Sequence, residues 1–276
     1  MTILYQHNIV DSSGMLFNGK ECGIMKAQKV RKAILLMSML VFPLTLNYFS
    51  PYLIVQGSFA GIASGSFLLF AALFLTSLFF GRAFCGWVCP AGGLQEGCGE
   101  INGKPAGPRQ NRIKYWVWTP WVGSILAGFL SAGGIREVRP FYFTDHGISV
   151  SNNYGYITYF LVVGLIAGTA LLFRRRSFCH SICWMAPFMV IGSRIKNKLG
   201  YPSLRLEAAA SQCVSCKACD KACPMSLPVS RMVKEERMDH DECILCRNCV
   251  DGCHKGAIRI GLGRRTPIDS SLSKGL

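Results

Sequence analysis

The chain has 276 residues, half of them hydrophobic and only 16% charged, and its formal net charge is +15. So low a charged fraction is unusual for a soluble protein and favours one that places much of its surface in lipid. Nucleic-acid binding is the rival explanation of the cations. They adjoin apolar stretches, however, and neither a recognition helix nor a stacking-aromatic platform accompanies them. We therefore expect them to meet membrane lipid and not nucleic acid.

Residues 1–32 precede the first apolar stretch and are expected to form a cytoplasmic N-terminal segment. Four uncharged stretches then predict four transmembrane helices, because about 20 apolar residues cross a bilayer. They lie near residues 33–55, 58–80, 115–135 and 154–173. In the long run that the first two share, Ser50-Pro51 and Gln56-Gly57-Ser58 are expected to supply the turn. The alternative, a buried helical core, needs amphipathic partner helices that the sequence lacks.

Lysine and arginine gather on one side of these predicted helices. They precede the first helix, occupy the loop 81–114 and return as Arg174-Arg175-Arg176, whereas the turn between the first two helices has none. Cytoplasmic loops carry the excess of Lys and Arg in membrane proteins. We therefore expect a multi-pass protein of the cell membrane with both termini in the cytoplasm.

Two predicted helices end in the same pattern, Phe-x-x-Arg-x-Phe-Cys-x-x-x-Cys, offset by 94 residues. One copy contains Cys85 and Cys89, the other Cys179 and Cys183. Each half is thus two helices and a cysteine pair, which predicts a 2+2 parallel repeat. Cysteines four apart on a helix share a face, so the two pairs can form a four-thiol site. Such a site suits a third iron–sulfur cluster, copper, zinc or a redox-active dithiol; inert burial is the alternative.

A further helix is predicted after the second pair. Apolar residues recur there at helical spacing with basic residues between them: Phe188, Ile191, Ile195 and Leu199, with Arg194, Lys196 and Lys198. This pattern predicts an amphipathic helix on the membrane surface. It completes a membrane domain that we place at residues 33–200.

The C-terminal region, residues 201–263, contains the C-x-x-C-x-x-C-x-x-x-C run of bacterial ferredoxins twice. In two-cluster ferredoxins the fourth cysteine of each run ligates the other cluster. We expect one [4Fe–4S] cluster on Cys213, Cys216, Cys219 and Cys253, and a second on Cys243, Cys246, Cys249 and Cys223. Zinc ribbons lack this spacing, and disulfides require an oxidising compartment. Cys22 and Cys98 have no partner pattern and are expected to be unligated, and residues 264–276 are expected to be a flexible tail.

The predicted fold is thus an α-helical membrane domain joined to an α+β ferredoxin domain with two clusters. The sequence has no C-x-x-C-H for an attached haem and no glycine-rich nucleotide-binding motif. Electrons must therefore move through the iron–sulfur clusters, and the four-thiol site is a further candidate.

The motif Cys85-Gly86-Trp87-Val88-Cys89-Pro90, its second copy at Cys179 and Cys183, four predicted helices and the double ferredoxin run together resemble one family. It is the membrane ferredoxin-type quinol dehydrogenase component of periplasmic nitrate reductase systems. The same core recurs in regulators of nitrous-oxide reduction and in copper-oxidase assembly proteins. The likeness begins near residue 30; one departure is Trp184, where the first copy has Pro90. The resemblance implies electron exchange between the quinone pool and another redox protein or subunit.

Three functions fit these observations. The chain is the electron-transfer subunit of a quinol oxidoreductase, a copper-reducing assembly protein, or a membrane anchor for a redox complex. For quinol we expect an inner site at Trp87 and the four cysteines of the C-x-x-x-C motifs. The alternative is an outer site on the aromatic loop from Arg139 to His146, where the aromatic residues also suit a membrane-interface belt.

Overall fold

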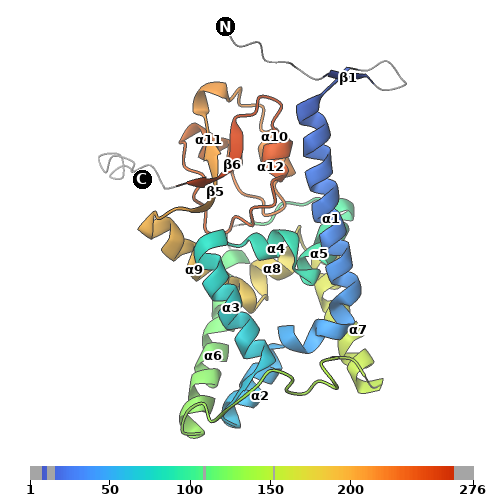
Figure 1. The fold of residues 1–276 in the computed structure, drawn as a ribbon, viewed down its shortest axis with the longest axis vertical. Coiled ribbons are helices and arrows are strands. Elements are labelled where there is room, and N and C mark those ends of the chain that lie inside the picture. Colours follow the sequence, from blue (N-terminus) through green and yellow to red (C-terminus); the bar gives the residue numbers. More distant parts are fainter. Residues whose placement is uncertain (1–7, 11–15, 108–109, 152, 264–276) are drawn as a thin grey trace.

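The computed structural model describes residues 8–10, 16–107, 110–151 and 153–263, with side chains described from Ala27 onward. The expected tail 264–276 and the side chain of Cys22 lie outside these residues. The ferredoxin region occupies one end of the molecule, the long helices run to the other, and short cysteine-bearing helices lie between them (Figure 1).

The first long helix differs from the predicted boundaries. Helix α1 spans Gly19–Thr45, the 3-10 turn η1 spans Leu46–Phe49, and α2 spans Pro51–Phe59. The pair Ser50-Pro51 starts a helix instead of making the expected turn. Its serine Oγ accepts a hydrogen bond from the Leu53 amide at 3.4 Å, and proline at the first helical position is favourable. The chain reverses at Gly61, which has a positive φ of 70°.

The other three long helices agree more closely with the prediction. They are α3 (Gly65–Phe80), α6 (Gln110–Ser131) and α7 (Asn153–Leu172). A parallel pair of short strands, β3 (Ile62–Ser64) and β4 (Glu137–Arg139), joins the two loops at the far end. Another pair, β1 (Asn8–Val10) and β2 (Leu16–Asn18), precedes α1.

Apolar side chains cover the outside of the long helices. The segments Ala27–Phe59 and Asn153–Leu172 are long and apolar enough to cross a membrane, and α3 is a shorter apolar helix. Only 17% and 11% of their most apolar windows are buried, unlike the core helix of a soluble protein. Further exposed apolar side chains lie on α3, α6 and α7: Leu75, Phe79, Leu126, Leu130, Phe160 and Leu161. These exposed surfaces indicate a membrane protein.

The ferredoxin region closes on itself through an antiparallel pair. Strand β5 (Ser203–Ala208) pairs with β6 (Ile258–Gly263) along its whole length. The short helices α10 (Ala218–Ala222), α11 (Val229–Lys234) and α12 (Asn248–Asp251) and the turn η2 (Ala210–Gln212) lie between the strands. Its apolar core is continuous with that of residues 19–200, which we call the helical layer. The two regions therefore pack against each other.

The predicted surface helix is wrong in one respect. Helix α9 (Met185–Leu199) packs along α3 so closely that a Cβ on Gly192 would lie 1.8 Å from the Ser77 Oγ. Arg194 and Lys198 are exposed as expected, but Lys196 is buried and donates to the Leu204 carbonyl at 2.8 Å. The helical pattern alone could not show that Lys196 is buried beside the ferredoxin region.

Several cations assigned to the membrane surface are likewise buried. Glu242 of the ferredoxin region forms ion pairs with Arg82, which follows α3, and with Lys114 of α6. All three side chains are at least 92% buried. Although burial alone would raise it, Arg82 and then Lys114 hold the pKa of Glu242 at about 2. The ionised Glu242 therefore stabilises the folded protein fully above pH 4.5, the ordinary pKa of a glutamate. This contribution is lost as the pH falls through about 2.

A second buried carboxylate is bound in the same way. Glu96 of α5 (Pro90–Ile101) pairs with Arg31 of α1 and, at 2.8 Å, with Arg176, and both arginines are 1% exposed. The two arginines outweigh the cost of burial and lower the pKa of Glu96. These buried pairs replace the lipid contacts that we expected for Arg31, Arg82, Lys114 and Arg176.

Replacing Glu242 tests how much its two buried ion pairs contribute to the stability of the protein. Glu242→Gln keeps the shape but leaves two buried cations uncompensated, so we expect a loss of roughly 3–5 kcal/mol in urea unfolding of the detergent-solubilised protein. The control is Glu235→Gln, which breaks an exposed pair with Arg231 at 3.7 Å. Its effect should stay within about 0.5 kcal/mol. Equal stability of the two variants would contradict the assignment.

Candidate iron–sulfur centres

The two ferredoxin runs have the same backbone course, 30 residues apart. Ser215 and Leu245 have positive φ values of 57° and 50°, and Lys217 and Arg247 have values of 57° and 67°. Such values are uncommon for residues other than glycine and mark a constrained turn. Matching constraints at matching positions show that both runs curve around the same kind of centre.

The fourth cysteine of the first run lies with the second run. A small cavity is lined by Cys223, Cys243, Cys246 and Cys249 and otherwise almost wholly by apolar side chains. Burial, followed by the Cys243, Cys246 and Cys223 thiols, raises the pKa of Cys249. In the first run, burial and Asp220, together with the Cys253 thiol, raise the pKa of Cys219 to about 11. The cavity places Cys223 with the second run, as crossed ligation requires, and the corresponding position of Cys253 stays a prediction.

The two ligand groups differ in exposure. Cys246 and Cys249 are 7% and 8% exposed, and the Cys243 pKa is raised to about 12 by burial. In the first group Cys213 and Cys253 are half-buried and Cys216 is exposed. The second group therefore lies inside the molecule and the first opens on its surface. His254, which stands after Cys253 where the first run has Pro224 after Cys223, is exposed.

The four cysteines of the C-x-x-x-C motifs converge as predicted, but not on single helices. Cys85 lies in α4 (Ala83–Trp87) and Cys89 directly precedes α5 (Pro90–Ile101). Cys179 lies in α8 (Ser177–Ser181) and Cys183 follows it. A break between short helices thus brings each pair together. Each side chain is 4–6% exposed. Burial, followed by the other three thiols, raises the pKa of Cys89 well above its usual range.

The two halves contribute to this four-thiol site at matched positions. The Cys85 Sγ lies 4.0 Å from the Met189 Sδ, and the Gln95 Nε2 donates to the Cys179 Sγ at 3.1 Å. Gln95 and Met189 are offset by the same 94 residues as the cysteines. Each half therefore packs its helix after the cysteine pair against the first cysteine of the other half.

Two buried arginines adjoin the four thiols. Arg82 and Arg176 interact electrostatically with Cys85 and Cys179. The Nε and Nη2 atoms of Arg82 and the Nε of Arg176 have no hydrogen-bond partner within the described residues. Unpartnered buried cationic donors suit an anionic group. A [4Fe–4S] core with four thiolates is such a group, so the residues present fit it.

The described residues contain no group of three or more Cys, His, Asp or Glu side chains close enough together to hold one metal ion. In a [4Fe–4S] core each thiolate binds a different iron, so the ligands of a cluster surround it at wider separations than those of a single ion.

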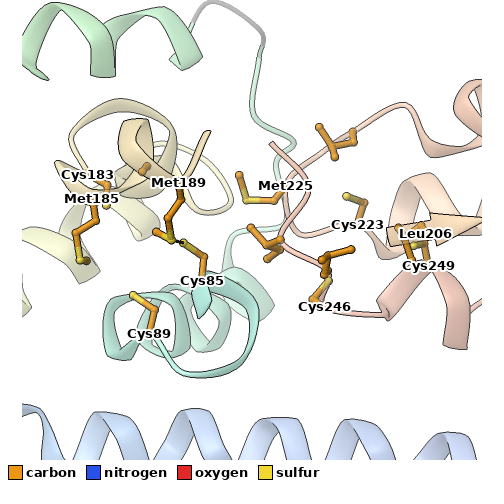
Figure 2. Close-up of a cluster of buried hydrophobic side chains, with 14 of the residues drawn as sticks. Cys85, Cys89, Cys183, Met185, Met189, Leu206, Cys223, Met225, Cys246 and Cys249 are labelled. Carbon is orange, nitrogen blue, oxygen red and sulfur yellow. Dashed lines mark hydrogen bonds between the residues drawn. The ribbon is translucent and has the colours of Figure 1, made fainter. Parts of the chain in front are cut away.

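The four-thiol site and the second ferredoxin run touch each other. The Trp87 Nε1 donates to the Leu245 carbonyl at 3.0 Å, and a Cβ on Gly86 would lie 2.3 Å from the Ile244 carbonyl oxygen. Only glycine permits this approach. Figure 2 shows the two groups of sulfur side chains, with Met225 between them. Trp87, predicted at a quinol site, thus joins the two regions.

The predicted outer site lies far from these cysteines. The segment between β4 and α7 crosses the opposite end of the long helices (Figure 1). Its Asp145 and His146 form an exposed pair at 2.8 Å, and Phe141 and Phe143 are 66% and 60% exposed. The loop therefore presents its aromatic residues to the surroundings.

Together these centres define an iron–sulfur protein of the ferredoxin type. A family model described as a 4Fe-4S binding domain matches residues 63–106 and 154–202, the two segments that contain the C-x-x-x-C pairs. Another, described as a 4Fe-4S dicluster domain, matches residues 212–258. The protein is thus an iron–sulfur protein with 4Fe-4S domains in both of its regions.

The relatives include proteins whose names refer to electron transport or to ferredoxin. YccM of Escherichia coli, which carries the name of an electron transport protein, is 28% identical over 73% of this chain and 57% of its own length. The ferredoxin-type protein MauN of Methylorubrum extorquens is 29% identical over 63% of the chain and 59% of its own. NirI of Paracoccus denitrificans is 29% identical over 66% of the chain and 26% of its own.

The chain therefore spans less than two thirds of each of these three relatives. None of the three is the nitrate reductase component that the sequence resembles. No solved structure is significantly similar to the chain.

Changing the fourth cysteines tests the crossed ligation. Cys223→Ser should mainly alter the electron paramagnetic resonance signal of the second-run cluster, and Cys253→Ser that of the first-run cluster, because crossed ligation assigns each thiol to the cluster of the other run. Cys98→Ser, in a half-buried position on α5, should change neither signal. If each serine variant alters only the cluster of its own run, the crossed arrangement is wrong.

Proposed function

We propose that this protein exchanges electrons between the membrane quinone/quinol pool and a redox partner, as the electron-transfer subunit of a quinol oxidoreductase. The observation that carries this proposal is the contact of Gly86 and Trp87 with residues 244 and 245. It places the four-thiol site of the helical layer directly against the inner ligand group of the ferredoxin region. The exposed first group then offers a surface for the partner.

The ligand sets form three centres in a row. Cys243, Cys246, Cys249 and Cys223 hold one [4Fe–4S] cluster, and Cys213, Cys216, Cys219 and Cys253 hold another. Cys85, Cys89, Cys179 and Cys183 hold a third, supported by the match to a 4Fe-4S binding domain and by the two buried arginines. When bound, such clusters supply one-electron transfer. Burial raises the pKa of Cys89 and of Cys243, and cluster insertion must release the protons of the thiols that bind it.

Metal analysis tests the third centre. Three clusters predict about twelve iron and twelve sulfide per chain, whereas the ferredoxin domain alone predicts about eight. Cys179→Ser should lower the iron content toward eight without changing the signals of the ferredoxin clusters. Eight iron in the unchanged protein, prepared without oxygen, would refute a third cluster.

The proposed topology has four membrane crossings, one by α1 with α2 and one each by α3, α6 and α7. The ferredoxin domain and both termini are cytoplasmic in this arrangement. It is supported by Arg112 and Arg174, which are exposed near the cysteine-bearing end, as the positive-inside rule requires.

One observation favours a second candidate function, copper reduction or metalloenzyme assembly. The Met189 Sδ lies 4.0 Å from the Cys85 Sγ, and thioether with thiolate ligands select Cu(I). Copper in place of iron at the four-thiol site, lost in Cys85→Ser, would favour this candidate. Its relation to copper-oxidase assembly proteins rests on sequence resemblance.

The junction offers a direct test of electron transfer. Gly86→Ala places a Cβ 2.3 Å from the Ile244 oxygen and must separate the two regions. We expect quinol-driven reduction of the ferredoxin clusters in vesicles to slow by about tenfold, equivalent to about 1.4 kcal/mol in barrier. Reduction by dithionite should be unchanged.

The matched control is Gly97→Ala on α5, where an added Cβ meets nothing within 4 Å; it should leave the quinol-driven rate unaltered. A protein that only anchors a redox complex would show no quinol-driven reduction in any form.

A further inference from the structure

An apolar cavity of about 250 Å³ lies inside the helical layer, beside the four-thiol site. Its walls come from the end of α1, η1, the start of α2, the middle of α7 and the segments around the second cysteine of each pair. Cys89 and Cys183 line it directly. The cavity therefore connects the helical layer with the proposed third centre.

The cavity opens on the apolar surface. Tyr52 and Leu165, which line it, are 69% and 43% exposed, and Thr158 is exposed beside them. These residues belong to α2 and α7, within the two segments that are apolar and long enough to cross a membrane. An occupant would therefore enter from the lipid and must itself be largely apolar.

The walls favour a flat ring. Six aromatic side chains line the cavity: Phe42, Phe49, Tyr52, Phe70, Phe178 and Trp184. Aromatic rings bind other rings by offset or edge-to-face contact. The polar groups are few and mostly bonded within the protein: the Asn47 amide donates to the Phe143 carbonyl at 2.6 Å, and the Ser50 Oγ accepts from Leu53. A small ring with an apolar tail matches this lining better than a sugar or a phosphate does.

We propose that this cavity binds the ring of a membrane quinone, with Val162 of α7 in its wall and Thr158 at its entrance. The assignment rests on the proposed function and locates the quinone site within the helical layer. It keeps Cys89 and Cys183 of the predicted inner site but not Trp87, whose indole donates to the Leu245 carbonyl. It leaves out the predicted outer site, because His146 lies on an exposed loop at the other end. A lipid acyl chain is the competing occupant, and it has no need of aromatic walls.

Photolabelling tests the site by binding alone. A photoreactive azidoquinone, bound to the holoprotein in detergent, should label peptides that contain residues 158–165 or 184–185. Narrowing the cavity with Val162→Phe, or its mouth with Thr158→Phe, should raise the apparent Kd for a short-tailed quinone about tenfold. Thr158 is exposed, whereas Val162 is half-buried against the core, so Thr158→Phe is the variant that disturbs packing less.

The control fills a different apolar groove, lined by Leu36, Leu94, Gly97 and Leu171. Gly97→Leu should leave labelling and the Kd unchanged, since nothing lies within 4 Å of a Cβ there. Labelling of residues 139–146, labelling of the Trp87 side chain without label on residues 158–165 or 184–185, or loss of label to excess phospholipid but not to excess quinone would each overturn the proposal.

The binding test and the test of function can fail separately. In one outcome, the quinone labels the cavity, Val162→Phe abolishes the label, and quinol does not reduce the clusters. This outcome would contradict the proposed function and support the binding site. Quinol-driven reduction that persists undiminished in both cavity variants would overturn the site and leave the function standing.

Discussion

One buried carboxylate, Glu242, fixes the ferredoxin region on the helical layer, and a second, Glu96, joins elements within that layer. Glu242 binds Arg82 and Lys114, and Glu96 binds Arg31 and Arg176. Removing either partner of a buried pair leaves a charge in a medium of low dielectric, which is costly. The cations project from the helical layer, so the ferredoxin region satisfies them only where Glu242 meets them. This constraint turns its second run, and not its first, toward the four thiols.

The same arginines have a second role. Arg176 binds Glu96 and donates to the Cys85 carbonyl at 3.0 Å, so it joins the two cysteine-bearing segments. It also interacts electrostatically with Cys246 of the ferredoxin region. Positive charge at this position favours thiolate over thiol in both ligand groups. The residues that hold the regions together thereby also assist in holding anionic clusters.

The two halves of the helical layer contact each other's first cysteine from matched positions but with different residues. Cys85 meets Met189 while Cys179 meets Gln95, although these partners occupy matched positions. One side of the four-thiol site is therefore a thioether and the other an amide donor. Because an amide hydrogen bond to sulfur alters the potential of a cluster, the two sides are not electronically equivalent.

The sequence by itself determined the two ferredoxin runs, the paired cysteine motifs and most of the long helices. Cysteine spacing and uncharged stretches are local patterns, so the two ferredoxin runs, the paired motifs and α3, α6 and α7 could be predicted. Only the tertiary structure decided the burial of Arg82 and Lys196, the packing of α9, the role of Gly86 and Trp87 at the junction, and the cavity at Cys89. Each depends on a contact between residues far apart in the chain, as Arg82 and Glu242 are. A cation near a helix end has the same sequence signature whether it faces lipid headgroups or a buried carboxylate, and only the folded chain supplies that carboxylate.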